Sequence, residues 1–255
     1  MTTMNAEASG MHEVRIGLST RATATIVGAL FLAATASFIA GEQLIVRVLR
    51  SPEALAASGN VLALGALLAF IDGIAVVGIA VLLFPVLRRV SEPLAVGYVG
   101  LRVTEFAAIL LYVASPLSVS ALARAVTDGT VGASALQGLG PALHAEHDMA
   151  LQLIYLLNGI AGSLLAVLLY RSRLIPRGIV VLGLIGYPVL LVGTVLAIFR
   201  VTEVTQGAGL LAVVPGALFE LVLPIWLITR GFARSDVADE ASKSWSGPVP
   251  QPQLT

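Results

Sequence analysis

The chain has 255 residues, of which 57% are hydrophobic and 12% are charged, and its mean hydropathy is +0.94. Soluble domains carry about 25% charged residues, so this composition excludes a soluble globular fold. Fifteen basic residues balance fifteen acidic ones and cysteine is absent, which leaves no excess positive charge for nucleic-acid binding and excludes disulfides and thiolate chemistry.

Six stretches of the chain are long and apolar enough to cross a bilayer as helices. A hydrocarbon core about 30 Å thick needs roughly 20 helical residues, and looser structures would leave backbone groups unpaired in lipid. None of the stretches shows the alternation of a barrel strand. The predicted spans are Ala22 to Ala40, Val61 to Leu87, Leu94 to Ala121, Met149 to Tyr170, Gly178 to Phe199 and Gly207 to Thr229.

These spans predict an all-α, six-helix transmembrane bundle formed by residues 22–232. Residues 1–21 are predicted to be a cytoplasmic segment, and residues 233–255, which mix charges with prolines, a disordered cytoplasmic tail. Lys and Arg accumulate on the cytoplasmic side of membrane proteins. Ten basic residues fall on the side of the two termini and four on the other, so both termini are predicted to be cytoplasmic and the long Arg124 to Asp148 loop external.

Four ionisable side chains lie inside the predicted spans, where each costs at least about 2.5 kcal/mol near the bilayer centre. Asp72 is in the second span, Arg102 and Glu105 share one face of the third, and Glu220 is in the sixth. Because helix directions alternate, all four are expected near the midplane or the inner leaflet, in one polar cluster. Three acids against one base require protonation, a bound cation or water. Alternatively, the cluster only ties helices together through hydrogen bonds.

A second polar group lies at the outer ends of the first and fourth spans. If the fourth helix begins near Pro141, a favoured first-turn residue, His144 shares a face with His147 or Asp148, and this face continues inward through Tyr155 and Asn158. The group comprises Glu42, His144, His147 and Asp148. Tyr98, Tyr155 and Asn158 are the residues expected to line a cavity.

Two histidines at i and i+3 beside a carboxylate can bind zinc, which makes His144, His147 and Asp148 candidate metal ligands. The same run of residues also fits helix capping and carboxylates favoured by the helix dipole, and the sequence favours this second interpretation. Glycines at 183, 186 and 193 indicate close helix packing. Tyr98, Tyr170 and Trp226 are typical of anchors at the inner membrane boundary.

Several stretches resemble the DUF4386 family of bacterial integral membrane proteins. They are LGALLAFIDGIAVVGIAVLLFPVLRR from Leu64 to Arg89, LAVGYVGLRVTE from Leu94 to Glu105, YRSRLIPR from Tyr170 to Arg177, and ALFELVLPIWLITRGF from Ala217 to Phe232. Positions matching the family pattern are Tyr98, Arg102, Glu105, His147, Asp148, Arg173, Pro176, Glu220 and Trp226. Met149 to Leu151 departs from it, because an aromatic residue is expected after His-Asp. The resemblance implies a multi-pass protein of the bacterial cytoplasmic membrane and implies no reaction.

Three functions remain open. In the first, the Arg102 cluster binds or translocates a small polar solute, an ion or a proton. In the second, the protein is an intramembrane enzyme that acts on a lipid or isoprenoid, with His144, His147 and Asp148 as metal ligands or acid/base groups. In the third, it is a structural or regulatory subunit. The expected partners are the bilayer and a small polar or lipidic ligand; a homo-oligomer stays open, and no cofactor is indicated.

Overall fold

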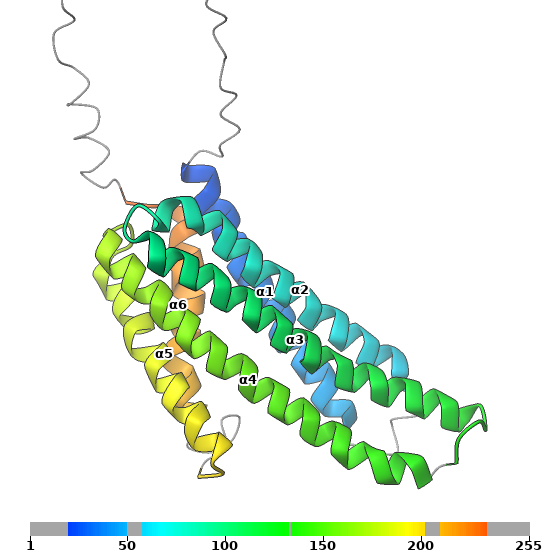
Figure 1. The fold of residues 1–255 in the computed structure, drawn as a ribbon. Coiled ribbons are helices and arrows are strands. Elements are labelled where there is room, and N and C mark those ends of the chain that lie inside the picture. The colour runs from blue at the N-terminus through cyan, green and yellow to red at the C-terminus, as the bar shows by residue number, and fades with distance from the viewer. Residues whose placement is uncertain (1–19, 50–57, 133, 202–209, 234–255) are drawn as a thin grey trace, which may run out of the picture.

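The computed structural model describes residues 20–49, 58–132, 134–201 and 210–233. These ranges form six helices and no strand: α1 (Thr20–Leu49), α2 (Gly59–Leu87), α3 (Glu92–Thr127), α4 (Ser134–Ser172), α5 (Arg177–Ile198) and α6 (Leu210–Thr229) (Figure 1). Each helix contains a segment long and apolar enough to cross a membrane. The prediction of an all-α, multi-pass membrane protein is therefore confirmed.

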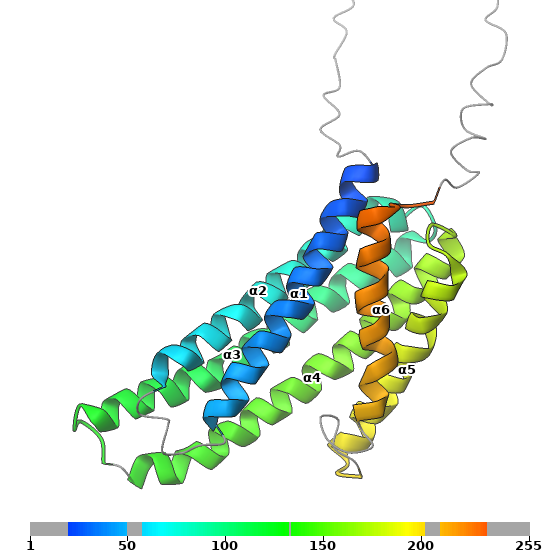
Figure 2. The same cartoon turned by 180° about the vertical axis from the view of Figure 1, so that it is seen from behind.

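The helices form a ring in which each packs on the next in the chain and α6 packs back on α1. The start of α1 and the end of α6 lie at the same end of the bundle (Figures 1 and 2), where the Arg21 guanidinium donates to the carbonyls of Ile228 at 2.8 Å and Thr229 at 3.2 Å. This end is called the closed end below. Which side of the membrane it faces stays a prediction from the distribution of basic residues.

Glycines let neighbouring helices approach closely. A Cβ on Gly28 of α1 would lie 2.8 Å from the Pro224 carbonyl of α6, and one on Gly193 of α5 would lie 2.8 Å from the Ala212 Cβ of α6. A Cβ on Gly186 would collide with the α6 backbone. A Cβ on Gly183 would lie 3.0 Å from the Phe219 ring of α6, so the packing role predicted for the glycines at 183, 186 and 193 is confirmed, and Gly28 adds a contact that was not predicted.

The outward faces of the helices carry large apolar side chains. Such a surface is too extensive for a soluble monomer and suits contact with lipid tails. Side chains more than half exposed on three of the helices include Leu67, Ile74, Val103, Leu111, Ile185 and Val192.

Several helices extend further than predicted. α1 continues to Leu49 rather than ending at Ala40, and α4 begins at Ser134 rather than near Pro141 or Met149, so Pro141 lies inside the helix. A turn between α3 and α4 replaces the long external loop that was predicted. The α1 extension mixes charged and polar residues such as Glu42, Gln43 and Arg47 with apolar ones such as the fully buried Ile45, so hydropathy places the end of the span too early.

Candidate binding site in the membrane interior

Arg102 of α3 is the centre of a buried polar network and is only 3% exposed. Its Nη1 lies 2.6 Å from Oε2 of Glu105 and donates to Oδ1 of Asn158 on α4 at 3.0 Å. Its Nε donates to the Tyr98 hydroxyl at 3.4 Å, and the guanidinium carbon lies 5.5 Å from the centre of the Tyr98 ring. Arg102 and Glu105 thus form an ion pair with no net charge, fixed in place by Tyr98 and Asn158.

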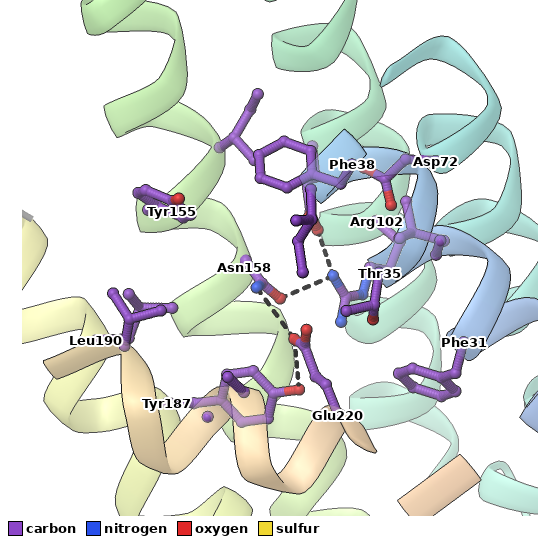
Figure 3. Close-up of a pocket in the computed structure, with 18 residues that line it drawn as sticks. Phe31, Thr35, Phe38, Asp72, Arg102, Tyr155, Asn158, Tyr187, Leu190 and Glu220 are labelled. Carbon is purple, nitrogen blue, oxygen red and sulfur yellow. Dashed lines mark hydrogen bonds and ion pairs between the residues drawn. The ribbon is translucent and has the colours of Figure 1, made fainter. Parts of the chain in front are cut away.

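Glu220 of α6 joins the same network from the opposite side (Figure 3). Its Oε1 accepts hydrogen bonds from the Asn158 amide at 3.3 Å and from the Tyr187 hydroxyl of α5 at 3.1 Å. Asn158 therefore uses its oxygen toward Arg102 and its nitrogen toward Glu220, which matches the donor and acceptor types of these groups. One side chain of α4 links a carboxylate on α6 to the guanidinium on α3.

These groups line a cavity of about 170 Å³ between the helices. Asp72 of α2 also faces it, and among the described residues none donates a hydrogen bond to the Asp72 carboxylate. Every helix contributes to the wall, most of which is apolar or aromatic. The apolar and aromatic side chains on the wall include Phe31, Phe38, Ile39, Ile154, Tyr155, Tyr187, Leu190 and Val213.

The structure places all four ionisable residues from the predicted spans around this one cavity. Tyr155 and Asn158 line it as the sequence predicted, whereas Tyr98 lies against Arg102 and is not among the lining residues. Tyr98 is also completely buried, so its predicted role as an interfacial anchor is wrong. Its hydroxyl binds Arg102, which outweighs the general preference of tyrosine for the membrane boundary. Tyr187 was missed; the signal was a hydroxyl that, with that of Thr194, is one of two in an otherwise apolar span.

The cavity carries more acid than base. Asp72, Glu105 and Glu220 line it, and Arg102 is the one Lys or Arg on its wall within the described part of the chain. Glu105 is paired with Arg102, so Asp72 and Glu220 have no cationic counterpart on the wall. Buried charges without partners are costly in a medium of low dielectric constant. The arrangement therefore favours a positively charged occupant or protons.

The cavity reaches the side of the bundle between α1 and α6. These helices touch at the closed end, where Gly28 meets Pro224, and they separate toward the other end (Figure 2). Ile39 of α1 lines the cavity and is also 56% exposed on the outer surface, so the wall continues to the lipid-facing side. Val213 and Ala217 of α6 line the cavity as well.

The residues predicted at the outer ends of the spans separate into two groups. His147 is completely buried, and its Nε2 lies 3.4 Å from Oε2 of Glu42 on α1. The Tyr112 hydroxyl of α3 donates to the same Glu42 oxygen, and its ring centre lies 4.3 Å from that of His147. His144 and Asp148 form a separate, more exposed pair with Nε2 and Oδ2 at 3.7 Å.

Of the two alternatives predicted for His144, the shared face with Asp148 is confirmed and the one with His147 is wrong. His144 and Asp148, one turn apart, lie on a partly exposed face of α4, so the predicted inward course of this face is wrong, and His147 alone is buried in the bundle. No group of three or more His, Asp or Glu side chains suited to a metal ion occurs within the described ranges. The geometry thus gives the candidate zinc ligands no common centre.

A family model for DUF4386, a domain of unknown function, matches residues 26–231. The chain belongs to the DUF4386 family. The match runs from α1 through α6, so every residue that lines the cavity of this DUF4386 protein falls within the family domain. No curated protein and no solved structure matches the chain.

Proposed function

We propose that this protein binds a small organic cation in the cavity between its six helices and carries it across the membrane. The observation that supports the proposal is the excess of two carboxylates, Asp72 and Glu220, over the paired Arg102 and Glu105 on the wall of an intramembrane cavity. A bound cation offsets charges that the bilayer interior otherwise disfavours.

The wall selects the kind of cation. Phe31, Phe38, Tyr155 and Tyr187 surround the carboxylates, and aromatic ring faces attract organic ammonium groups. An inorganic ion prefers a shell of oxygen ligands, which this largely apolar wall provides poorly. A protonated amine with a short apolar substituent uses both kinds of surface.

The network also gives binding a route to conformational change. Glu220 shares Asn158 with Arg102, so a cation that draws the Glu220 carboxylate toward itself weakens its hydrogen bond from Asn158. Asn158 links α6 to α3 and α4, so weakening its hydrogen bond to Glu220 weakens the contact of α6 with these two helices. When no cation is bound, protons occupying the same carboxylates restore neutrality, so protons compete with the amine.

Binding of a panel of small amines to the protein in lipid nanodiscs tests this proposal. The panel contains methylammonium, tetramethylammonium and phenethylammonium, with acetate and glycerol as anionic and neutral comparisons. We expect saturable binding of at least one amine, weaker at lower pH, and weaker in Glu220→Gln and Asp72→Asn. Glu146→Gln, on the exposed face of α4, is the matched control and should bind normally.

The proposal is overturned if no amine binds above the level seen with empty nanodiscs. It is also overturned if both cavity variants bind the amines as well as the unmodified protein does. Either result, together with loss of stability in the same variants, would support a structural role for the network. Flux of the bound amine into proteoliposomes then tests translocation, and binding without flux would limit the function to binding.

A further inference from the structure

We propose that Glu42, Tyr112 and His147 form a proton-binding site beside the cavity, and that its proton and the cation in the cavity disfavour one another. The proton-binding site stands on its own observations, whereas its coupling to the cation rests on the proposed function. Together they make the protein an exchanger of protons for small cations. The three residues come from α1, α3 and α4, and the site is called the proton site below.

The central observation is the burial of His147 without hydrogen-bond partners among the described residues. Its side chain is completely buried, and within the described part of the chain neither ring nitrogen has a hydrogen-bond partner. Buried polar groups are nearly always hydrogen-bonded, and leaving one unpaired costs about 1–3 kcal/mol. Its Nε2 stands 3.4 Å from the Glu42 carboxylate but is not oriented to form a hydrogen bond with it.

A single proton would satisfy Nε2, one of the two unpaired ring nitrogens. Bound to the Nε2 lone pair of a neutral imidazole, it makes His147 a cation whose N–H donates to Glu42, and the pair changes from a net charge of −1 to zero. The ion pair is then short, charge-assisted and shielded from water. Tyr112 already donates to the same Glu42 oxygen and holds the carboxylate in position.

The groups that face His147 are few. Glu42 approaches from α1 and Tyr112 from α3, and Asp72 of α2 lies close enough to Tyr112 to act on it electrostatically. On α4 itself, His144 and Asp148 pair with each other, with side chains 41% and 55% exposed. The proton site is thus separate from the outer pair and responds to charges in the interior.

Phe38 connects the proton site to the cavity. Its ring centre lies 6.0 Å from Tyr112 and 6.4 Å from Tyr155, and both Phe38 and Tyr155 line the cavity. Phe38 and Glu42 stand one turn apart on the same face of α1. In addition, the Glu42 charge acts electrostatically on Tyr155.

The sign of the coupling follows from charge. A cation near Asp72 and Glu220 makes the interior more positive, which weakens proton binding at His147, and a proton at His147 weakens cation binding by the same factor. Cation entry therefore favours proton release. A carrier with this linkage exchanges one positive charge for another.

Ring-¹⁵N histidine NMR on the protein in nanodiscs measures the proton site directly. The chain has three histidines, His12, His144 and His147, and His144→Gln and His147→Gln assign the signals. We expect the His147 ring to change between its neutral and protonated spectra as the pH is varied. Glu42→Gln should move the half-protonation point to lower pH by at least about 1 unit, because it removes an opposite charge in contact. His144 should not respond to this change and serves as the control.

Tyr112→Phe keeps the ring contact and removes the hydrogen bond to Glu42, so it should move the His147 half-protonation point to higher pH. This opposite shift separates a proton site from a general loss of structure. A His147 signal that stays neutral from pH 5 to pH 9, or that ignores both substitutions, would overturn the proton site.

The linkage is tested without a ligand by Glu220→Gln, which removes one negative charge from the cavity as a bound cation would. We expect the His147 half-protonation point to fall, by less than in Glu42→Gln. An unchanged value overturns the linkage. If these titrations give the expected results but no amine binds, the proposed function is overturned and the proton site still stands.

Discussion

The interior of the bundle contains two groups of ionisable side chains, and their hydrogen bonding differs. Around Arg102, partners from four helices are joined in a continuous network that opens on a cavity. Around His147, three side chains are packed together and both imidazole nitrogens lack hydrogen-bond partners among the described residues. The first group has space and excess negative charge, which suits a ligand of some size. The second places an unpaired imidazole nitrogen beside a carboxylate, which suits a proton.

The largest expected effect comes from breaking the ion pair at the centre of the first group. Arg102→Leu leaves the Glu105 carboxylate buried without its partner, which costs about 3–5 kcal/mol in the free energy of unfolding. Unfolding in a mild detergent titrated with dodecyl sulfate measures this. The double variant Arg102→Leu with Glu105→Leu should recover most of the loss, while Arg47→Leu, at an exposed site on α1, should change little. Equal stability of the single variant and the unmodified protein would contradict the account.

A smaller loss is expected where α1 and α6 meet at the closed end. Gly28→Val places a side chain against the Pro224 carbonyl and should cost about 1–3 kcal/mol through overpacking. Gly100→Val on α3, where a Cβ has open space around it, is the matched control and should be tolerated. The same unfolding assay compares them, and equal effects would mean that this contact does not close the ring.

Glu220→Gln should separate ligand binding from stability. It removes a charge but leaves an oxygen that can still accept from Asn158 and Tyr187, so the free energy of unfolding should change by less than about 1 kcal/mol. Amine affinity should fall about tenfold to a hundredfold, the value of a charged hydrogen bond. Equilibrium binding and unfolding on the same preparation check both. A large loss of stability with unchanged affinity would assign Glu220 to helix association.

The smallest effect is expected for Tyr187→Phe, which deletes one donor to Glu220 and keeps the ring against Phe219. The free energy of unfolding should fall by about 1 kcal/mol, the typical net value of one hydrogen bond. Tyr170→Phe, at an exposed position at the end of α4, is the control. A loss several times larger would show that Tyr187 supports more of the network than its single contact with Glu220.

The sequence predicts the six helices and the interior ionisable residues well, because lipid constrains both strongly. Unpaired backbone groups and charges are so costly in hydrocarbon that long apolar segments and the few charges within them stand out. Asp72, Arg102, Glu105 and Glu220 were recognisable for this reason. Helix direction also placed them at a similar depth in the membrane, which allowed the hypothesis that they meet in one cluster.

What the sequence could not predict depends on the rotation of each helix about its axis. The rotation of α4 places His147 against Glu42 and leaves His144 and Asp148 on a more exposed face. The position of Phe38 between Tyr112 and Tyr155 requires the partner helices to be known. A hydropathy profile indicates the length of each span and the depth of its residues in the membrane, but it does not indicate the rotation of the helix about its axis.

Amine binding to the double variant Asp72→Asn with Glu220→Gln tests the central claim most directly. This protein keeps the Arg102–Glu105 pair and the shape of the cavity while the two unpaired charges are gone. The account predicts that binding of the amine taken up by the unmodified protein is lost and that stability is kept or increased. Undiminished binding by a folded double variant would contradict it.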